Sequence, residues 1–377
     1  MRTEARIDLG AIRDNVRALA EHAAGGAGVM VVVKADGYGH GLVPSARAAV
    51  AGGAAWLGVA FLEEALALRA SGVDVPLLAW LTTPGEDLVP AVAAGVDLGI
   101  YDGAELGAAA TAAGAAGRPA RLQLKVDTGL SRGGAMPDAW PDLCAAAAEA
   151  EAGGDVQITG VWSHFAFADG GPDHPTNARQ ASVFAEALEV AERAGLQPEV
   201  RHLANSAATL TAPSTHYDLV RPGLAAYGLS PVPQLGGPEQ FGLRPAMTLA
   251  STVALVKQVP SGSGVSYLHR HVTSDPTTLA LVPLGYADGV PRSATGIGPV
   301  QLRGRRRTIA GTVCMDQFVL DVGTDEVAAG DEVLLFGPGD QGEPTAQDWA
   351  EVLGTINYEI VTRIGARVPR VLVGGTT

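Results

Sequence analysis

Lys34 has the clearest chemical potential in this sequence, because of its position and its surroundings. It ends a short run of β-branched and apolar residues, Val29–Lys34, and a turn with glycines at positions 37, 39 and 41 follows. A short apolar run without alternation is typical of a strand buried on both faces of a parallel sheet. Such folds build their sites at the carboxyl ends of the strands. Burial there lowers the pKa of a lysine, whose amine then attacks aldehydes. A solvated lysine just past a strand is the alternative.

Lysine is rare in this chain, which has only Lys34, Lys125 and Lys257. Arginine cannot form a Schiff base, so the few lysines of this chain are candidates for roles that arginine cannot fill. The glycines after Lys34 allow the backbone to approach a ligand closely, and Tyr38 lies four residues beyond the amine. These features favour a functional role for Lys34.

A second segment, Lys125–Arg132, lies at the end of the fifth predicted strand. A guanidinium such as that of Arg132 can hold a carboxylate through two parallel hydrogen bonds. An ordinary surface ion pair between Arg132 and Asp127 is the alternative.

Two histidines, His164 and His202, also follow predicted strands. A lone histidine is more often a hydrogen-bonded structural residue than a catalyst, and these two could orient an arginine or a phenol. Ser206 is better placed for direct ligand contact, as a phosphate-binding hydroxyl after the seventh strand.

The loop after the eighth predicted strand contains Arg221, Gly223 and Leu224. In (β/α)8 barrels the loops after strands seven and eight commonly bind phosphate. We therefore expect the backbone of Gly223 and Leu224 to join Ser206 at a phosphate. From position alone, Arg221 could be simply a charged residue before a proline.

Regularly alternating strands and alanine-rich helices position these residues. An opening helix, Ile7–Ala20, has Asp8 near its start. The eight predicted strands are Val29–Lys34, Ala55–Ala60, Val75–Leu81, Val96–Tyr101, Arg121–Val126, Ile158–His164, Glu199–Leu203 and Tyr217–Arg221. The helical segments between them include Glu63–Ser71, Asp102–Ala113, Pro141–Ala152 and Asn177–Ala194. This pattern predicts an α/β fold with an N-terminal (β/α)8 barrel of the TIM type; a doubly wound open sheet is the alternative.

The pattern changes at Pro231–Gly242, which is rich in proline and glycine and indicates a domain boundary. We predict a barrel over residues 1–235 and a mostly β domain over residues 236–377. Short runs separated by turn residues predict its strands, at Met247–Val259, Thr278–Leu284, Val300–Leu302, Thr308–Val313, Phe318–Val322 and Glu332–Phe336.

Whole-chain properties exclude several classes. A net charge of −14 argues against nucleic acid or an anionic membrane as partner. Residues 1–20 carry charges and lack the apolar core of a signal peptide. Cys144 and Cys314 give neither a metal-ligand spacing nor a disulfide framework. We expect a cytoplasmic protein without a metal.

The segment Lys-Ala-Asp-Gly-Tyr-Gly-His-Gly at Lys34–Gly41 resembles the pyridoxal-phosphate lysine segment of alanine racemases. The resemblance runs from Ile7-Asp8-Leu9 to Asn357-Tyr358-Glu359, through separated motifs in the expected order. Pro231–Gln240 is the stretch that does not align. The segments that carry it in the second domain are Gly264-Val265-Ser266-Tyr267, Val313-Cys314-Met315-Asp316-Gln317 and Ile356-Asn357-Tyr358-Glu359-Ile360.

The resemblance implies a homodimeric fold-type-III pyridoxal-phosphate enzyme that interconverts L- and D-alanine and supplies D-alanine for bacterial peptidoglycan. Lys34 and Tyr267 would be the two bases, on opposite faces of Cα, with Lys34 also holding the cofactor as a Schiff base. Arg132 and Met315 would bind the substrate, and Lys125 would be carbamylated. Tyr267 and Met315 would come from the partner subunit. The other implied cofactor-binding residues are Tyr38, His164, His202, Ser206, Arg221, Gly223, Leu224 and Tyr358.

Other enzyme classes remain as alternatives. A broad-specificity amino-acid racemase would share almost every motif. A fold-type-III decarboxylase would share both domains, although no strong match to its C-terminal cysteine motif is present. In the second domain, a packed aromatic is the structural alternative for Tyr267.

Overall fold

The computed structural model describes residues 2–375, apart from the side chain of Ala24. It divides into two compact units, of which the first comprises Ile12–Leu243. The second comprises the residues through Ala11 together with those from Arg244 onward. The barrel unit thus runs to Leu243, past the predicted boundary at 235/236, and the residues through Ala11 belong with the second unit.

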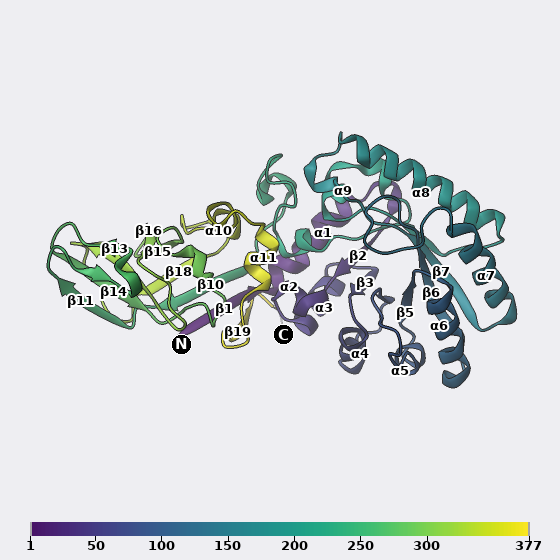
Figure 1. Ribbon diagram of the computed structural model, residues 1–377, viewed down its shortest axis with the longest axis horizontal. Helices are drawn as coiled ribbons and strands as arrows, with labels where there is room; N and C mark the ends of the chain where they lie inside the picture. The colour runs from purple at the N-terminus through teal and green to yellow at the C-terminus, as the bar shows by residue number, and fades with distance from the viewer. Residues whose placement is uncertain (1, 376–377) are drawn as a thin grey trace. The chain divides into compact units, whose positions relative to one another are not determined.

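The first unit is a ring of eight parallel strands in the order β8-β7-β6-β5-β4-β3-β2-β9 (Figure 1). The end strands β8 and β9 are joined by backbone hydrogen bonds from Asp218 to Arg201 and from Arg221 to Ala204. Each predicted strand is present, and the consecutive order excludes a doubly wound sheet, whose strand order reverses. The bounds are β2 (Gly28–Val32), β3 (Trp56–Val59), β4 (Leu77–Ala79), β5 (Asp97–Ile100), β6 (Ala120–Lys125), β7 (Val156–Trp162), β8 (Val200–His202) and β9 (Leu219–Val220).

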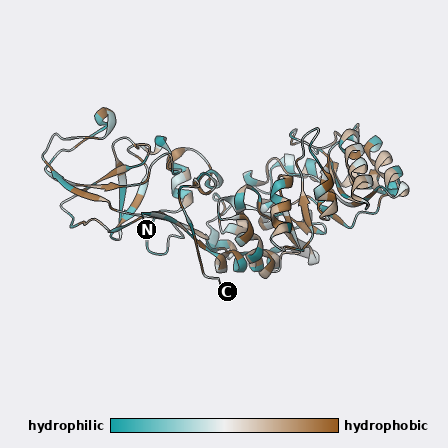
Figure 2. Cartoon of the chain, turned by 90° about the horizontal axis from the view of Figure 1, so that it is seen from below, coloured by the Kyte–Doolittle hydropathy of each residue, from teal (hydrophilic) through white to brown (hydrophobic). Residues whose placement is uncertain are grey.

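Helices alternate with these strands and bury their apolar faces against the outside of the ring. Leu122, Leu124 and Val126 alternate along and just past β6 and pack into that core, as the two-residue period of a strand requires. In Figure 2 the barrel strands are largely brown, and the helices carry both colours. The helices are α1 (Leu9–His22), α2 (Lys34–Tyr38), α3 (Leu42–Ala51), α4 (Leu62–Ala70), α5 (Val89–Ala93), α6 (Gly103–Ala116), α7 (Trp140–Gly153), α8 (Pro175–Arg193) and α9 (Ser206–Thr211). Short 3₁₀ turns are η1 (Ala24–Gly26), η2 (Ala168–Gly170), η3 (Pro213–Thr215), η4 (Leu224–Tyr227) and η5 (Pro238–Phe241).

The opening helix begins later than predicted, because its first residues belong to a strand. Thr3–Asp8 forms β1, which pairs with strands of the second unit. Its alternation buries Ala5 and Ile7 completely. Asp8 then accepts a hydrogen bond from the backbone N–H of Ala11 at 3.0 Å and so caps α1.

The second unit is built on a nine-stranded sheet in the order β11-β14-β17-β16-β15-β18-β10-β1-β19. The predicted run Met247–Val259 is two strands rather than one. The strands from Met247 on are β10 (Met247–Thr252), β11 (Leu255–Val259), β12 (Gly264–Val265), β13 (His271–Val272), β14 (Thr277–Val282), β15 (Pro299–Leu302), β16 (Arg305–Ala310), β17 (Phe318–Gly323), β18 (Glu332–Phe336) and β19 (Arg370–Val373). Helical segments are α10 (Ala346–Leu353), α11 (Asn357–Thr362), η6 (Tyr267–His269) and η7 (Arg292–Ala294).

None of the helices within residues 2–375 combines the length and the apolar character that crossing a membrane requires.

Candidate active site

Lys34 follows the carboxyl end of β2, two residues after Val32, and begins a left-handed turn. Ala35, Asp36 and Tyr38 have φ angles of 53°, 54° and 53°. Such a conformation costs a non-glycine residue about 1–2 kcal/mol, so the surrounding structure must hold it. Lys34 is partly buried, and its Nζ lies 5.8 Å from the centre of the Trp80 ring. Burial, and then the charge of Arg132, lower the pKa of the Lys34 amine.

Glu64 on α4 holds this turn. One of its carboxylate oxygens accepts a hydrogen bond from the N–H of Ala35 at 2.7 Å. The other accepts from the N–H groups of Ala60 at 2.9 Å and Phe61 at 3.2 Å. One carboxylate therefore ties the residue after Lys34 to the end of the neighbouring strand. Glu64 was not predicted from the sequence, although an acidic residue in the first turn of a helix was an available signal.

Tyr38, Ser206 and Gly223, which we predict to bind phosphate, are neighbours in the barrel. The Tyr38 hydroxyl occupies the space that a Cβ on Gly223 would need, so any larger residue at position 223 would displace the Tyr38 side chain. Ser206 Oγ accepts hydrogen bonds from the N–H groups of Gly223 at 2.9 Å and Ala225 at 3.4 Å. Leu224 begins η4, where an N–H group has no partner within the turn. Burial raises the pKa of the Tyr38 phenol, which stays a neutral donor.

Lys125 ends β6 and is buried between two aromatic rings. Its Nζ lies 4.6 Å from the Trp162 ring centre and 4.9 Å from that of Tyr101. Burial, followed by the charges of Arg132 and Arg221, lowers the pKa of Lys125 to about 8.

The alternative ion pair between Arg132 and Asp127 is wrong. Asp127 Oδ1 instead accepts hydrogen bonds from the backbone N–H groups of Gly129, Leu130 and Ser131, at 2.8, 2.9 and 3.1 Å. Arg132 is exposed and, within residues 2–375, forms no ion pair. Its guanidinium is therefore available to a carboxylate that the chain itself does not supply.

Arg221 follows β9 and is buried with neutral acceptors. It donates to His202 Nδ1 at 2.9 Å, to His164 Nδ1 at 3.2 Å and to the carbonyl oxygen of Ser163 at 2.7 Å. Burial lowers the pKa of Arg221 to about 9, so the side chain remains cationic at neutral pH.

Both histidines are neutral. Burial and then the charge of Arg221 lower the pKa of His202 well below its usual value, and the same causes, in the same order, act on His164. The other cations that lower the pKa of His164 are Arg132, Lys125 and Lys34. The barrel thus brings all four predicted cations to one end of its strands, where phosphate and carboxylate groups are the matching ligands.

Tyr267 and Met315 both line one cavity of about 500 Å³ in the second unit. Tyr267 is 71% exposed, so the packed-aromatic alternative is wrong for this residue within the chain. Two hydrogen bonds join its loop to the loop of Met315: Thr312 Oγ1 donates to the carbonyl of Tyr267, and Ser266 Oγ to that of Thr312, both at 2.7 Å. Tyr358 lies on α11 of the same unit and is partly buried.

Comparisons with known proteins point to one family. The family models described as "Alanine racemase, N-terminal domain" and "Alanine racemase, C-terminal domain" match residues 7–231 and 246–372. An alanine racemase of Frankia casuarinae is 64% identical over 370 residues, which cover 98% of this chain and 96% of the relative. One of Thermobifida fusca is 62% identical over 371 residues and 98% of each chain.

Solved structures agree with the sequence matches. Alanine racemase from D-cycloserine producing Streptomyces lavendulae superposes with a TM-score of 0.98 at 56% identity, over 100% of this chain and 98% of that one. The alanine racemase of Clostridium difficile 630 superposes with a TM-score of 0.92 at 31% identity, over 99% and 96% of the two chains.

Proposed function

The chain belongs to the alanine racemase family, and on that premise we propose that it interconverts L-alanine and D-alanine with pyridoxal 5′-phosphate. The observation that carries this proposal is the end of the barrel, where the Lys34 amine, its pKa lowered, lies among Lys125, Arg132 and Arg221. The product D-alanine serves bacterial cell-wall peptidoglycan.

The residues present fit the cofactor. Its phosphate requires hydroxyl and amide donors, and Tyr38, Ser206, Gly223 and Leu224 offer them in one place. We propose Tyr358 as a further donor to that phosphate. When bound, pyridoxal phosphate withdraws electrons from Cα of the attached amino acid. Lys34, the partly buried amine on the left-handed turn, would hold it as a Schiff base.

Arg221 would face the pyridine nitrogen of the cofactor, with His202 and His164 as its partners. Arginine only donates hydrogen bonds and does not give up its charge. A carboxylate at that nitrogen would keep it protonated, whereas the guanidinium of Arg221, which stays cationic, would disfavour the proton. In that position Arg221 would favour return of the proton to Cα over side reactions.

The two bases would be Lys34 and Tyr267, one on each face of Cα. In this assignment Lys34 removes or returns the proton of D-alanine, and Tyr267 that of L-alanine. Arg132 and the backbone of Met315 would hold the substrate carboxylate.

Lys125 would carry a carbamate, and two observations support this. Its pKa of about 8 leaves about a quarter of the amine neutral at pH 7.5, against about a thousandth for an ordinary lysine. Arg132 has no carboxylate of the described chain to orient it, and a carbamate at Lys125 would supply that anion.

The active enzyme would be a homodimer in which Tyr267 and Met315 serve the partner's barrel. The exposed Tyr267, Leu268 and Met315, three large side chains on one cavity of the second unit, support such an interface. Both cysteines are free, which fits a cytoplasmic location.

The test is conversion of pure L-alanine, followed by circular dichroism, in the protein loaded with pyridoxal phosphate. We expect the signal to decay to zero, the racemic end point, and to stay constant in Lys34→Arg, which keeps the charge but cannot form the Schiff base. L-serine and L-arginine are run in parallel. Rates on them equal to the alanine rate would favour the broad-specificity alternative, and no decay with any substrate would overturn the proposal.

A further inference from the structure

A buried series of hydrogen bonds starts at the cationic side chain of Arg221, passes through His202 and extends further into the barrel. His202 Nε2 donates to Gln123 Oε1 at 2.7 Å. Gln123 Nε2 donates to Asp97 Oδ2 at 3.0 Å. Gln123, Asp97 and His202 are essentially inaccessible to solvent. The chain runs inside the barrel from the carboxyl end of the strands, at Arg221, to the first residue of β5, Asp97.

The two end residues, Arg221 and Asp97, determine which atoms of His202 and Gln123 donate and which accept. Arg221 can only donate, and an ionised carboxylate such as that of Asp97 can only accept. His202 must therefore accept at Nδ1 and carry its proton on Nε2. Gln123 must turn its oxygen to His202 and its nitrogen to Asp97.

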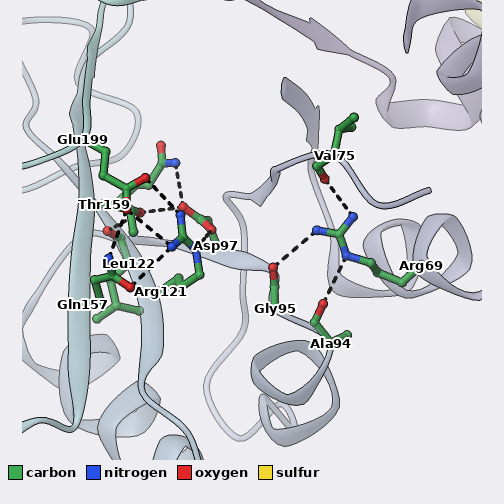
Figure 3. Close-up of polar contacts among 11 residues, drawn as sticks. Arg69, Val75, Ala94, Gly95, Asp97, Arg121, Leu122, Gln157, Thr159 and Glu199 are labelled. Carbon is green, nitrogen blue, oxygen red and sulfur yellow. Dashed lines mark hydrogen bonds and ion pairs between the residues drawn. The ribbon is translucent and has the colours of Figure 1, made fainter. Parts of the chain in front are cut away.

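Asp97 is itself anchored by further donors (Figure 3). Arg121 Nε lies 2.7 Å from Asp97 Oδ1, and Thr159 Oγ1 donates to Oδ2 at 2.5 Å. Arg121 also pairs with Glu199 at 3.3 Å. The carboxylate of Asp97 is therefore held in place by one cation, Arg121, and two neutral donors, Thr159 and Gln123.

Gly160 on β7 packs directly against the Gln123 side chain. A Cβ on Gly160 would lie 2.8 Å from Gln123 Cδ, which is closer than packed atoms approach. The register of β6 against β7 shifts between Leu122 and Gln123, and beside that shift Thr159 reaches Asp97. The absence of a side chain at Gly160 thus leaves room for a long side chain at position 123.

We infer that Gln123 and Asp97 are positioning residues for the reaction, which hold His202 in one tautomer and through it hold the Arg221 guanidinium. This inference rests on the proposed function, because it takes Arg221 to face the cofactor. Neither residue touches the cofactor in this scheme, and both act through His202.

The test compares Gln123→Met with Glu199→Gln. The methionine of the first variant has nearly the same length as glutamine but forms no hydrogen bond with His202 or with Asp97. The second variant removes Glu199, the other carboxylate partner of Arg121, and leaves every hydrogen bond between Asp97 and Arg221 in place. Both are labelled with ¹⁵N-histidine and studied first without cofactor, with His202→Asn used to assign the resonance. We expect His202 to carry its proton on Nε2 alone in the parent and in Glu199→Gln, and to populate both tautomers in Gln123→Met.

The loaded enzymes then give an independent readout. In Gln123→Met we expect kcat to fall on the order of tenfold, about what one buried hydrogen bond contributes, with KM for alanine little changed. We also expect more half-transamination per turnover, in which alanine and pyridoxal phosphate give pyruvate and pyridoxamine phosphate. An unchanged His202 tautomer in Gln123→Met, or equal changes in Glu199→Gln, would overturn the inference. Because the tautomer is read without cofactor or turnover, a parent protein that fails to racemise alanine would refute the proposed function and leave this result standing.

Discussion

At the scale of a single residue, the proposed role of Tyr267 is the most specific, because a two-base mechanism needs a group on the face of Cα opposite Lys34. A free phenol has a pKa of about 10, so Tyr267 needs cationic neighbours to act as a base. Arg221 would supply one such charge in the assembled site. His164 is neutral there, since burial and four neighbouring cations lower its pKa, so it can take part only as a hydrogen-bond partner.

In Tyr267→Phe we expect the cofactor to bind normally while racemisation falls by on the order of 10²–10⁴, the usual loss of general-base catalysis. Exchange of the Cα hydrogen from L-alanine in deuterated water should collapse, and exchange from D-alanine, served by Lys34, should persist. Equal and undiminished exchange from both enantiomers would show that one base works on both faces.

Lys125 is the second residue whose chemistry can be tested alone. Only a neutral amine combines with carbon dioxide, and the lowered pKa of about 8 makes that form available near neutral pH. With ¹³C-bicarbonate we expect a carbamate carbonyl signal that weakens as the pH falls below about 8, where the amine takes up a proton. Lys125→Arg should remove the signal, and Lys257→Arg, at an exposed position on β11, should keep it. A signal that survives in Lys125→Arg would contradict the assignment.

At the scale of an element, the left-handed turn after β2 presents Lys34 to the site, and α4 supports it through Glu64. The turn cannot hold itself, because three non-glycine residues adopt positive φ angles. The strand, the turn and the first turn of α4 therefore act as one element.

Glu64→Gln keeps one acceptor oxygen but cannot serve both Ala35 and the Ala60–Phe61 backbone. We expect urea unfolding of the cofactor-free protein to show a loss of about 1 kcal/mol, together with slower capture of pyridoxal phosphate. Glu63→Gln, at the exposed position beside it, is the matched control. Identical behaviour of the two variants would mean that Glu64 does not support the turn.

At the scale of the whole molecule, the proposal divides each site between two chains. Lys34→Arg and Tyr267→Phe should each be nearly inactive alone. After the two are unfolded and refolded together, hybrid dimers should contain one site with both native residues, and a random mixture should regain about a quarter of the parent activity. No recovery would mean that Lys34 and Tyr267 of the same chain work together, or that subunits do not exchange.

Much of this architecture was predictable from local sequence, and its omissions have physical causes. Each barrel strand was predicted because a buried parallel strand is a continuous apolar run, and the strand ends located Lys34, Lys125, His202 and Arg221. The pairing of β1 was missed, because its partners β10 and β19 lie more than two hundred residues away and local pattern does not encode such pairing.

The supporting residues were missed for a different reason. Gln123 and Asp97 belong to no motif, and their roles follow only from what lies across the barrel. A signal was nevertheless present, since a polar residue in Leu122-Gln123-Leu124 and in Val96-Asp97-Leu98 interrupts an otherwise apolar strand. Polar groups are buried only where partners satisfy them.

Whether Lys34 holds pyridoxal phosphate can be measured by covalent trapping. The protein is incubated with the cofactor, reduced with borohydride, digested and mapped by mass spectrometry. We predict that the pyridoxyl group is on Lys34 and that Lys34→Arg carries none. An adduct on Lys125 or Lys257 instead, or no adduct at all, would show that Lys34 does not hold the cofactor.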